Sequence, residues 1–235
     1  MRSFWRTLDR GTARDVALVC LAVAVVGASF GAISVAGGLP IWVPITMSVL
    51  VFAGGAQFAA VGVVLAGGGP AAAVAAGLLL NTRLLPYGFT LTDVLGGRWR
   101  TRLLGAHVIV DESVAFVLRQ RDRQSRRAVF WVCGLSLFSC WNLATVLGGF
   151  AGAAIGNTSA FGLDAAFPTV LLALVLPSMT DRGTRNAAML GAVAAVATTP
   201  FLPAGLPLLA ALAGLALARR SPGTVPQANS VREAS

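Results

Sequence analysis

Residues 51–62, VFAGGAQFAAVG, lie inside the longest stretch of this chain that carries no charge, residues 16–82. They place one glutamine, Gln57, and three glycines among valine, alanine and phenylalanine. A run this apolar favours a buried helix, whereas the adjacent pair Gly54 and Gly55 weakens one. We therefore expect a hydrophobic helix that is broken near its middle.

The composition indicates a membrane protein. Of the 235 residues, 56% are hydrophobic and 11% are charged, whereas a soluble globular protein carries about 25% charged residues. Lipid requires helices or closed barrels, and continuous apolar runs favour helices. At about 20 apolar residues for each crossing, we predict an all-α polytopic membrane protein with about 6–8 membrane segments. The apolar stretches are 16–37, 41–68, 70–91, 128–156, 164–180 and 185–218.

The charges predict how these segments are oriented. The net charge is +9, and all 18 basic residues are arginines. The arginines form clusters that separate hydrophobic spans, so they favour cytoplasmic loops over a nucleic-acid surface. We expect cytoplasmic termini. The predicted parts are an N-terminus at 1–14, a single membrane transport domain at 15–218 and a disordered tail at 219–235.

Two segments carry a further prediction. If every arginine cluster is cytoplasmic, an even number of crossings separates successive clusters. Three apolar stretches nevertheless lie between Arg14 and Arg98. Parity is restored if 41–68 is a broken or re-entrant helix, and the same logic applies to 103–118. Alternatively, 103–118 crosses fully and the arginines at 98–102 lie outside; the sequence leaves both arrangements open.

Glycines at four-residue spacing predict where helices pack closely. One set is Gly27 and Gly31, and the other is Gly148, Gly152 and Gly156. In lipid, where apolar burial drives no association, small residues let two helix backbones approach each other. The alternative is that these glycines only reflect a chain rich in glycine and alanine.

Charged residues near apolar runs mark a candidate site, since each costs about 2.5–3.5 kcal/mol at the centre of a membrane helix. Arg83 is either a cation that faces a cavity and pairs with an acid, or a side chain that reaches the membrane surface. Asp111 and Glu112 are adjacent, so on a helix they point about 100° apart. One can pair with Arg83 while the other binds or titrates; the alternative is a solvated loop.

Gln57 forms either a hydrogen bond between helices or part of a transport site. Gly54 and Gly55 favour the second, because transporter sites recur where a half-helix N-terminus meets an anionic group. A substrate carboxylate would bind backbone N–H groups there, up to Phe58. Because the cysteines lie in apolar runs and the chain has one histidine, we predict no metal site and no cofactor.

Four motifs, in this order and spacing, resemble those of the AzlC family of membrane permeases: GASFGAI, SVLVFAGGAQFAAVGVVLAG, LLLNTRLLPYG and HVIVDESVAFVL. The resemblance covers residues 15–120 in motif detail and extends to residue 218 in hydropathy alone. Each motif alone is weak, but the four together are specific.

The resemblance implies a multi-pass protein of the bacterial cytoplasmic (inner) membrane that exports branched-chain or similar small apolar amino acids. It implies secondary active transport with a small AzlD-type membrane subunit, and no enzymatic activity. The residues it marks for substrate binding or coupling are Gly54, Gly55, Gln57, Phe58, Asn81, Arg83, Asp111 and Glu112.

This chain departs from the family's pattern at four positions. Gly55 stands where alanine is usual, and Leu84 where histidine is common. Val110 stands where threonine is common, and Pro86 replaces a usual aliphatic residue. The missing histidine puts in doubt any proton route through that position.

The sequence leaves functions other than export of apolar amino acids to consider. A transporter of a different small organic acid or amino-acid analogue is the main alternative, because the sequence does not measure the shape of a pocket. A non-transporting assembly subunit is less favoured, since it needs no polar cavity. An intramembrane protease would need a nucleophile and a base, and His107 is the only histidine.

Overall fold

A computed structural model describes residues 10–155, 172, 176–180, 182–202, 207, 210 and 211. Within these residues all regular structure is helical, which confirms the predicted all-α class there. They belong to two compact units, 1–172 and 173–235. A single transport domain over 15–218 stays a prediction.

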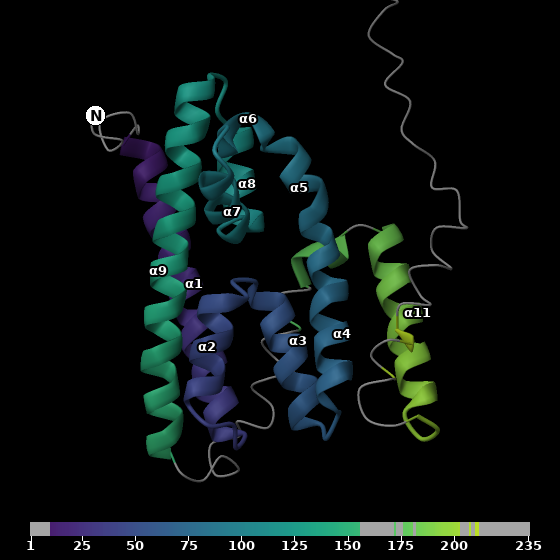
Figure 1. The fold of residues 1–235 in the computed structure, drawn as a ribbon. Helices are drawn as coiled ribbons and strands as arrows, with labels where there is room; N and C mark the ends of the chain where they lie inside the picture. Colours follow the sequence, from purple (N-terminus) through teal and green to yellow (C-terminus); the bar gives the residue numbers. More distant parts are fainter. Residues whose placement is uncertain are drawn as a thin grey trace, which may run out of the picture. The chain divides into compact units, whose positions relative to one another are not determined.

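Two long helices, α1 (Arg10–Ala36) and α9 (Arg123–Ile155), lie side by side in the first unit (Figure 1). Both begin among arginines and run in the same direction, so their basic ends lie together. Within the described residues, these two helices alone are long and apolar enough to cross a membrane. The predicted 6–8 membrane segments are therefore not confirmed.

Glycines lie where α1 and α9 are closest. A Cβ atom added to Gly31 would overlap the carbonyl oxygen of Thr145, and one added to Gly148 would overlap that of Ala28. Residue numbers rise together along both helices at this contact, as a parallel pair requires. No side chain fits between the two backbones, so their contact is direct backbone packing.

The remaining glycines of the two predicted sets extend this contact. A Cβ on Gly27 would lie 3.0 Å from the carbonyl oxygen of Trp141, and one on Gly152 would lie 2.5 Å from that of Ala32. Gly156 lies outside the described residues. The contact thus covers more than one turn of α1, from Gly27 to Ala32, and about three turns of α9, from Trp141 to Gly152.

The segment 41–68 forms two helices. The helix α2 (Trp42–Leu50) ends, residues 51–53 are not helical, and α3 (Gly54–Leu65) begins. We call α2, α3 and this link the first hairpin. Gly54 and Gly55 were expected to interrupt the helix, with its second half opening at residues 56–58; instead they form the first turn of α3.

The segment 103–118 is interrupted in the same way. The helix α7 (Trp99–His107) is separated from α8 (Asp111–Leu118) by residues 108–110, and we call this the second hairpin. The Val110 N–H donates to Ser113 Oγ over 3.1 Å at the start of α8. Both hairpins contact α9, at different levels along it (Figure 1).

A bent connection joins the two hairpins. It consists of α4 (Pro70–Asn81), η2 (Thr82–Leu84), α5 (Leu85–Thr90) and α6 (Thr92–Leu95). The helix α4 packs against α3, and α5 continues towards the second hairpin (Figure 1). Pro86 cannot donate a backbone hydrogen bond to Thr82, which explains why the regular α-helix gives way to a 3-10 turn here.

The surface of the first unit is rich in exposed apolar side chains. They follow α1, α4 and α9, and include Leu21, Val25, Val74, Leu78, Leu143, Leu147 and Phe150. Soluble monomers rarely expose apolar patches of this kind, and such surfaces mark contact with lipid or with another protein.

The second unit is described in part. It contains η4 (Leu176–Thr180) and α11 (Arg182–Thr198). Helix α11 ends before Thr199, within the apolar stretch 185–218. Most of the predicted segment 164–180 lies outside the described residues.

Candidate functional site

The tips of the two hairpins meet. His107 Nε2, at the end of α7, lies 2.8 Å from the carbonyl oxygen of Val49 in the last turn of α2. Because a carbonyl only accepts, this hydrogen bond requires the proton on Nε2. The links at 51–53 and 108–110 are thereby held next to each other. The lone histidine, which offered no metal or catalytic motif, joins the two hairpins.

Gln57 stabilises the first hairpin from inside. Its side chain is fully buried, and Nε2 donates to the carbonyl oxygen of Met47 over 2.9 Å. The Met47 carbonyl already accepts from the Val51 N–H, so Gln57 adds a second bond to it. The last carbonyl groups of a helix lack partners within it, and His107 supplies one to the carbonyl of Val49. Within the described residues, Gln57 Oε1 has no hydrogen-bond partner.

Aromatic rings fix the start of α3 against the long helices. Phe58 is fully buried, and its ring meets those of Phe30 and Trp141 at centroid distances of 5.3 and 6.5 Å. A Cβ on Gly54 would lie only 2.9 Å from Cη2 of Trp141, so a larger residue would displace the indole. Phe58 therefore lies in the core, and Gly54 allows α3 to begin against α9.

The N-terminus of α3 carries no side-chain cap and no acidic residue in its first turn. The Gln57 N–H bonds to the carbonyl of Ala53, which precedes the helix. The N–H groups before Gln57 have no partner within an α-helix, and the helix dipole adds partial positive charge there. This helix end can therefore bind a negatively charged group.

An ion pair lies beside that helix end. Arg83 Nη2 in η2 is 3.0 Å from Asp111 Oδ2 in the first turn of α8. A Cβ on Gly55 would lie 3.5 Å from the same Arg83 nitrogen. The side chains of Arg83 and Asp111 are 51% and 42% exposed, so the pair remains open to a ligand. The structure thus brings Gly55, Arg83 and Asp111 together.

Two further residues lie near this pair. Tyr87 in α5 is close enough to interact with both Asp111 and Arg83, and the sequence offered no signal for it beyond its place four residues after Arg83. Asn81 is the last residue of α4 and is half-buried. No hydrogen bond among the described residues ties it to the ion pair.

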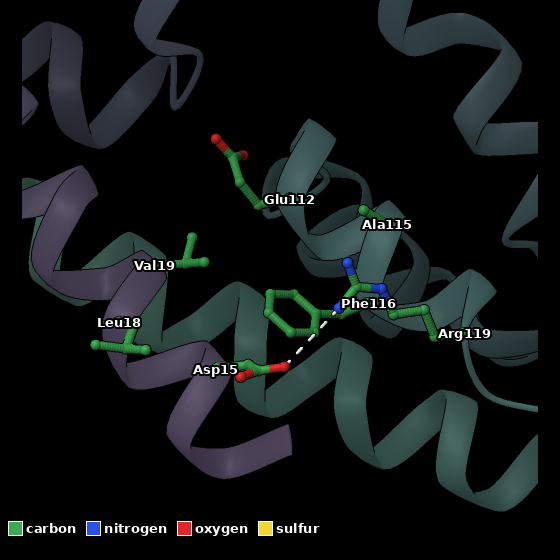
Figure 2. A pocket seen from close by; sticks show the side chains of 7 residues that line it. All are labelled: Asp15, Leu18, Val19, Glu112, Ala115, Phe116 and Arg119. Carbon is green, nitrogen blue, oxygen red and sulfur yellow. Dashed lines mark ion pairs between the residues drawn. The ribbon is translucent and has the colours of Figure 1, made fainter. Parts of the chain in front are cut away.

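Glu112 lies apart from its neighbour. Asp111 faces Arg83, whereas Glu112 lines a pocket between α8 and α1 (Figure 2). Two adjacent helical residues point in different directions, so the two acids cannot share one partner. The set of residues predicted from the sequence therefore divides between the hairpin tips, the buried core and this pocket.

The comparisons with known proteins identify the family of this chain. A family model described as AzlC protein matches residues 18–155, more than half of the chain. The chain belongs to the AzlC family. The matched region contains both hairpins, α9 and every residue predicted for substrate binding or coupling. The resemblance of the four sequence motifs to this family is thereby confirmed.

The chain is also similar to a known membrane protein. An uncharacterized membrane protein of Helicobacter pylori (strain ATCC 700392 / 26695) is 25% identical over 206 residues, covering 85% of this chain and 88% of the relative. No solved structure matches. AzlC proteins form a family of transporters, not of enzymes, so this chain is a membrane protein related to transport.

Proposed function

We propose that this AzlC-family protein is the large subunit of a secondary transporter that exports branched-chain or similar small apolar amino acids with a small AzlD-type partner. The observation that carries the proposal is the Arg83–Asp111 pair beside the uncapped N-terminus of α3. Intramembrane ionisable residues are expensive, and in a transport family they mark the substrate or ion route.

The charges of an amino acid match this arrangement. Its carboxylate would bind the first N–H groups of α3 and the Arg83 guanidinium, while its ammonium would bind Asp111. An ion pair this exposed contributes only about 0–1 kcal/mol, so exchanging its partners for a ligand costs little. Binding therefore requires no large rearrangement of the hairpin tips.

We further infer that both hairpins are re-entrant. If α1 and α9 both cross in the same direction, the chain between them must return once in net terms. The α4–α5 connection supplies that return, and each hairpin then enters and leaves on one side. This arrangement supports residues 1–14 as cytoplasmic, because the basic starts of α1 and α9 obey the positive-inside rule. Non-helical links at membrane depth are tolerated where protein surrounds them.

The partner would cover part of the exposed apolar surface. Leu78 on α4 and Leu147 on α9 are 65% and 69% exposed. Both lipid and a small membrane subunit offer apolar contact, and the family relationship favours a subunit on at least one of these faces. Co-purification of a small AzlD-type subunit with the full chain tests this assignment.

Export of amino acids is tested in cells loaded with a valine-containing dipeptide. Cells that produce the chain and its small partner should release valine several-fold faster than cells with an empty vector. Equal rates of valine release from the two cell types, with both subunits present in the membrane, would contradict the proposal. Faster release of an organic acid without faster release of valine would instead identify another substrate.

The role of the ion pair is tested by removing one charge at a time. We expect Arg83→Ala and Asp111→Asn each to reduce export at least tenfold while the protein remains in the membrane. The matched control is Asp93→Asn, which breaks the pair formed by Arg126 Nε and Asp93 Oδ2 at 2.9 Å, away from the hairpin tips. The control should keep export within twofold of the unmodified protein.

A further inference from the structure

A pocket of about 310 Å³ lies between α1 and α8, and neither Arg83 nor Asp111 lines it (Figure 2). Its size is near the lower end of the range of small-molecule sites, about 300–1,000 Å³. One face of α8 and its C-cap form one wall, with residues at i, i+3, i+4 and i+7: Glu112, Ala115, Phe116 and the capping Arg119. The opposite wall is the face of α1 that carries Asp15, Leu18 and Val19.

The two ends of this pocket carry opposite charges on α8. Glu112 lies at one end, and within the described residues its carboxylate forms no ion pair. Arg119 lies at the other end, with its Cζ atom 5.5 Å from the centroid of the Phe116 ring. Its contact with Asp15 is long, at 3.9 Å, and both side chains are more than half exposed. Such a pair is weak, so Arg119 can accept another anion.

The spacing of these charges fits a single amino acid. Glu112 and Arg119 are seven positions apart, which places their backbones about 10.5 Å apart along a helix. Both side chains lie on the same face, and their own length brings the two charged groups towards the pocket between them. A zwitterion whose ammonium donates to Glu112 and whose carboxylate accepts from Arg119 forms two charge-assisted hydrogen bonds of about 2.8 Å each. A lone carboxylate or a lone amine would satisfy one end only.

The walls between the charges are apolar. Leu18 and Val19 on α1, together with Ala115 and Phe116 on α8, supply the apolar lining of the pocket (Figure 2). An aliphatic side chain placed there would lose contact with water, which contributes about 25 cal/mol for each Å² of apolar surface removed. The pocket therefore offers a cation site, an anion site and an apolar surface at once.

We propose that the α1–α8 pocket is a second binding site of the exporter for a zwitterionic amino acid with an aliphatic side chain. The ammonium binds Glu112, the carboxylate binds Arg119, and the side chain lies between Leu18 and Phe116. This inference rests on the proposed function. The pocket lies at the arginine-rich ends of α1 and α9, so it receives the amino acid from the cytoplasm. Glu112 is adjacent to Asp111, which places the next site one residue away.

The test measures protection of the pocket itself. In the full chain, with its three cysteines replaced by alanine, Leu18→Cys is labelled with a maleimide in the presence and absence of leucine. Leucine should slow labelling at least fivefold. 4-Methylpentanoate and 3-methylbutylamine, which each lack one charge, should need at least tenfold higher concentrations. The matched control is Leu21→Cys, which is 66% exposed on α1 and outside the pocket; its labelling should not change.

Charge variants separate this site from the one at the hairpin tips. Glu112→Gln and Arg119→Gln should each remove protection of Leu18→Cys, whereas Asp111→Asn and the exposed Arg121→Gln should leave it intact. If Leu18→Cys does not fold, Val19→Cys replaces it. Protection that survives both pocket variants overturns the assignment, as does protection by phosphatidylethanolamine but not by leucine.

Export by the unmodified protein makes the two proposals distinguishable. Normal valine or leucine export without protection of Leu18→Cys overturns the second site and leaves the proposed function standing. Neither export nor protection overturns both. Protection together with a tenfold loss of export in Glu112→Gln supports both the pocket and its place on the transport route.

Discussion

The two hairpins use the same backbone arrangement for different purposes. In each, a helix of nine residues is followed by three non-helical residues and a second helix. The first hairpin is uncharged, and Phe52, Ala53 and Gln57 at its tip are buried. The second hairpin begins its second helix with Asp111 and Glu112, which remain partly exposed. The comparison shows that the N-terminus of a helix can be packed against buried apolar side chains, as in α3, or can carry acidic side chains, as in α8.

The difference extends to the helix dipoles. The start of α8 carries two acids, which compensate the partial positive charge at that helix end. The start of α3 carries none, so its N–H groups remain available to an external anion. Arg83 pairs with Asp111 at the start of α8, and its guanidinium also lies near Gly55 at the start of α3. The first hairpin therefore offers the anion site, and the second offers the cation site.

The largest effect should come from enlarging the first residue of α3. Gly54→Leu would push a side chain into Trp141, because a Cβ there already lies 2.9 Å from the indole. Overpacking typically costs about 1–3 kcal/mol and occasionally more. Here the indole that must move packs against the rings of Phe30 and Phe58, so we expect a cost at or above the top of that range. We expect a sharp loss of monodisperse protein in detergent. Wild-type yield and thermal midpoint for Gly54→Leu would show that the first hairpin is not held by packing.

Removing the buried amide should have the next largest effect. Gln57→Ala deletes the bond to Met47 and leaves a cavity, so we expect about 2–3 kcal/mol of destabilisation. Denaturant unfolding in detergent measures it. The control is Gln124→Ala on the exposed first turn of α9, which should change stability by less than about 0.5 kcal/mol. Equal effects of the two variants would contradict the structural role of Gln57.

Charge removal in the second hairpin should change stability much less. For Arg83→Gln and Asp111→Asn, a double-mutant cycle should give a coupling of about 0–1 kcal/mol, because both side chains are about half exposed. The same unfolding assay supplies all four values. A coupling of several kcal/mol would mean that the pair is buried in the membrane and acts as a structural clamp.

The smallest effect should come from filling the space beside Arg83. Gly55→Ala adds a methyl group 3.5 Å from the guanidinium, an ordinary contact, and alanine favours the helix. We expect stability within about 0.5 kcal/mol of the unmodified protein and export within twofold. A tenfold loss of export would show that the substrate occupies the space that the methyl group fills.

Part of this site could be predicted from particular residues. Adjacent acids on a helix must diverge, and Asp111 pairs with Arg83 whereas Glu112 lines the α1–α8 pocket. An arginine near an apolar run is stabilised by a negatively charged partner, and Arg83 does pair with Asp111. The α1–α8 pocket was missed, although the i, i+3, i+4 and i+7 spacing of its α8 residues was visible in the sequence. Nothing in one sequence states that α1 faces α8.

Other features depended on contacts between distant segments. The glycine pair predicted a break in 41–68, but the break lies three residues earlier, because α3 begins where Gly54 meets Trp141. The bonds of Gln57 to Met47 and of His107 to Val49 arise only once α2 has ended at a defined residue. Free carbonyl groups at a helix end have no signature in the side chains that later satisfy them.

The sequence of each segment specifies the local features of this protein: continuous apolar helices, arginines between them, and a few polar residues that need partners in lipid. These follow from local chemistry, since helix formation and the cost of burying charge depend on each segment alone. Which helix ends lie next to each other depends on tertiary packing. It joined two interrupted helices at their tips, matched an uncapped helix N-terminus with Arg83 and Asp111, and left Glu112 across a pocket from α1. Those pairings depend on close backbone packing between α1 and α9, which no single segment encodes.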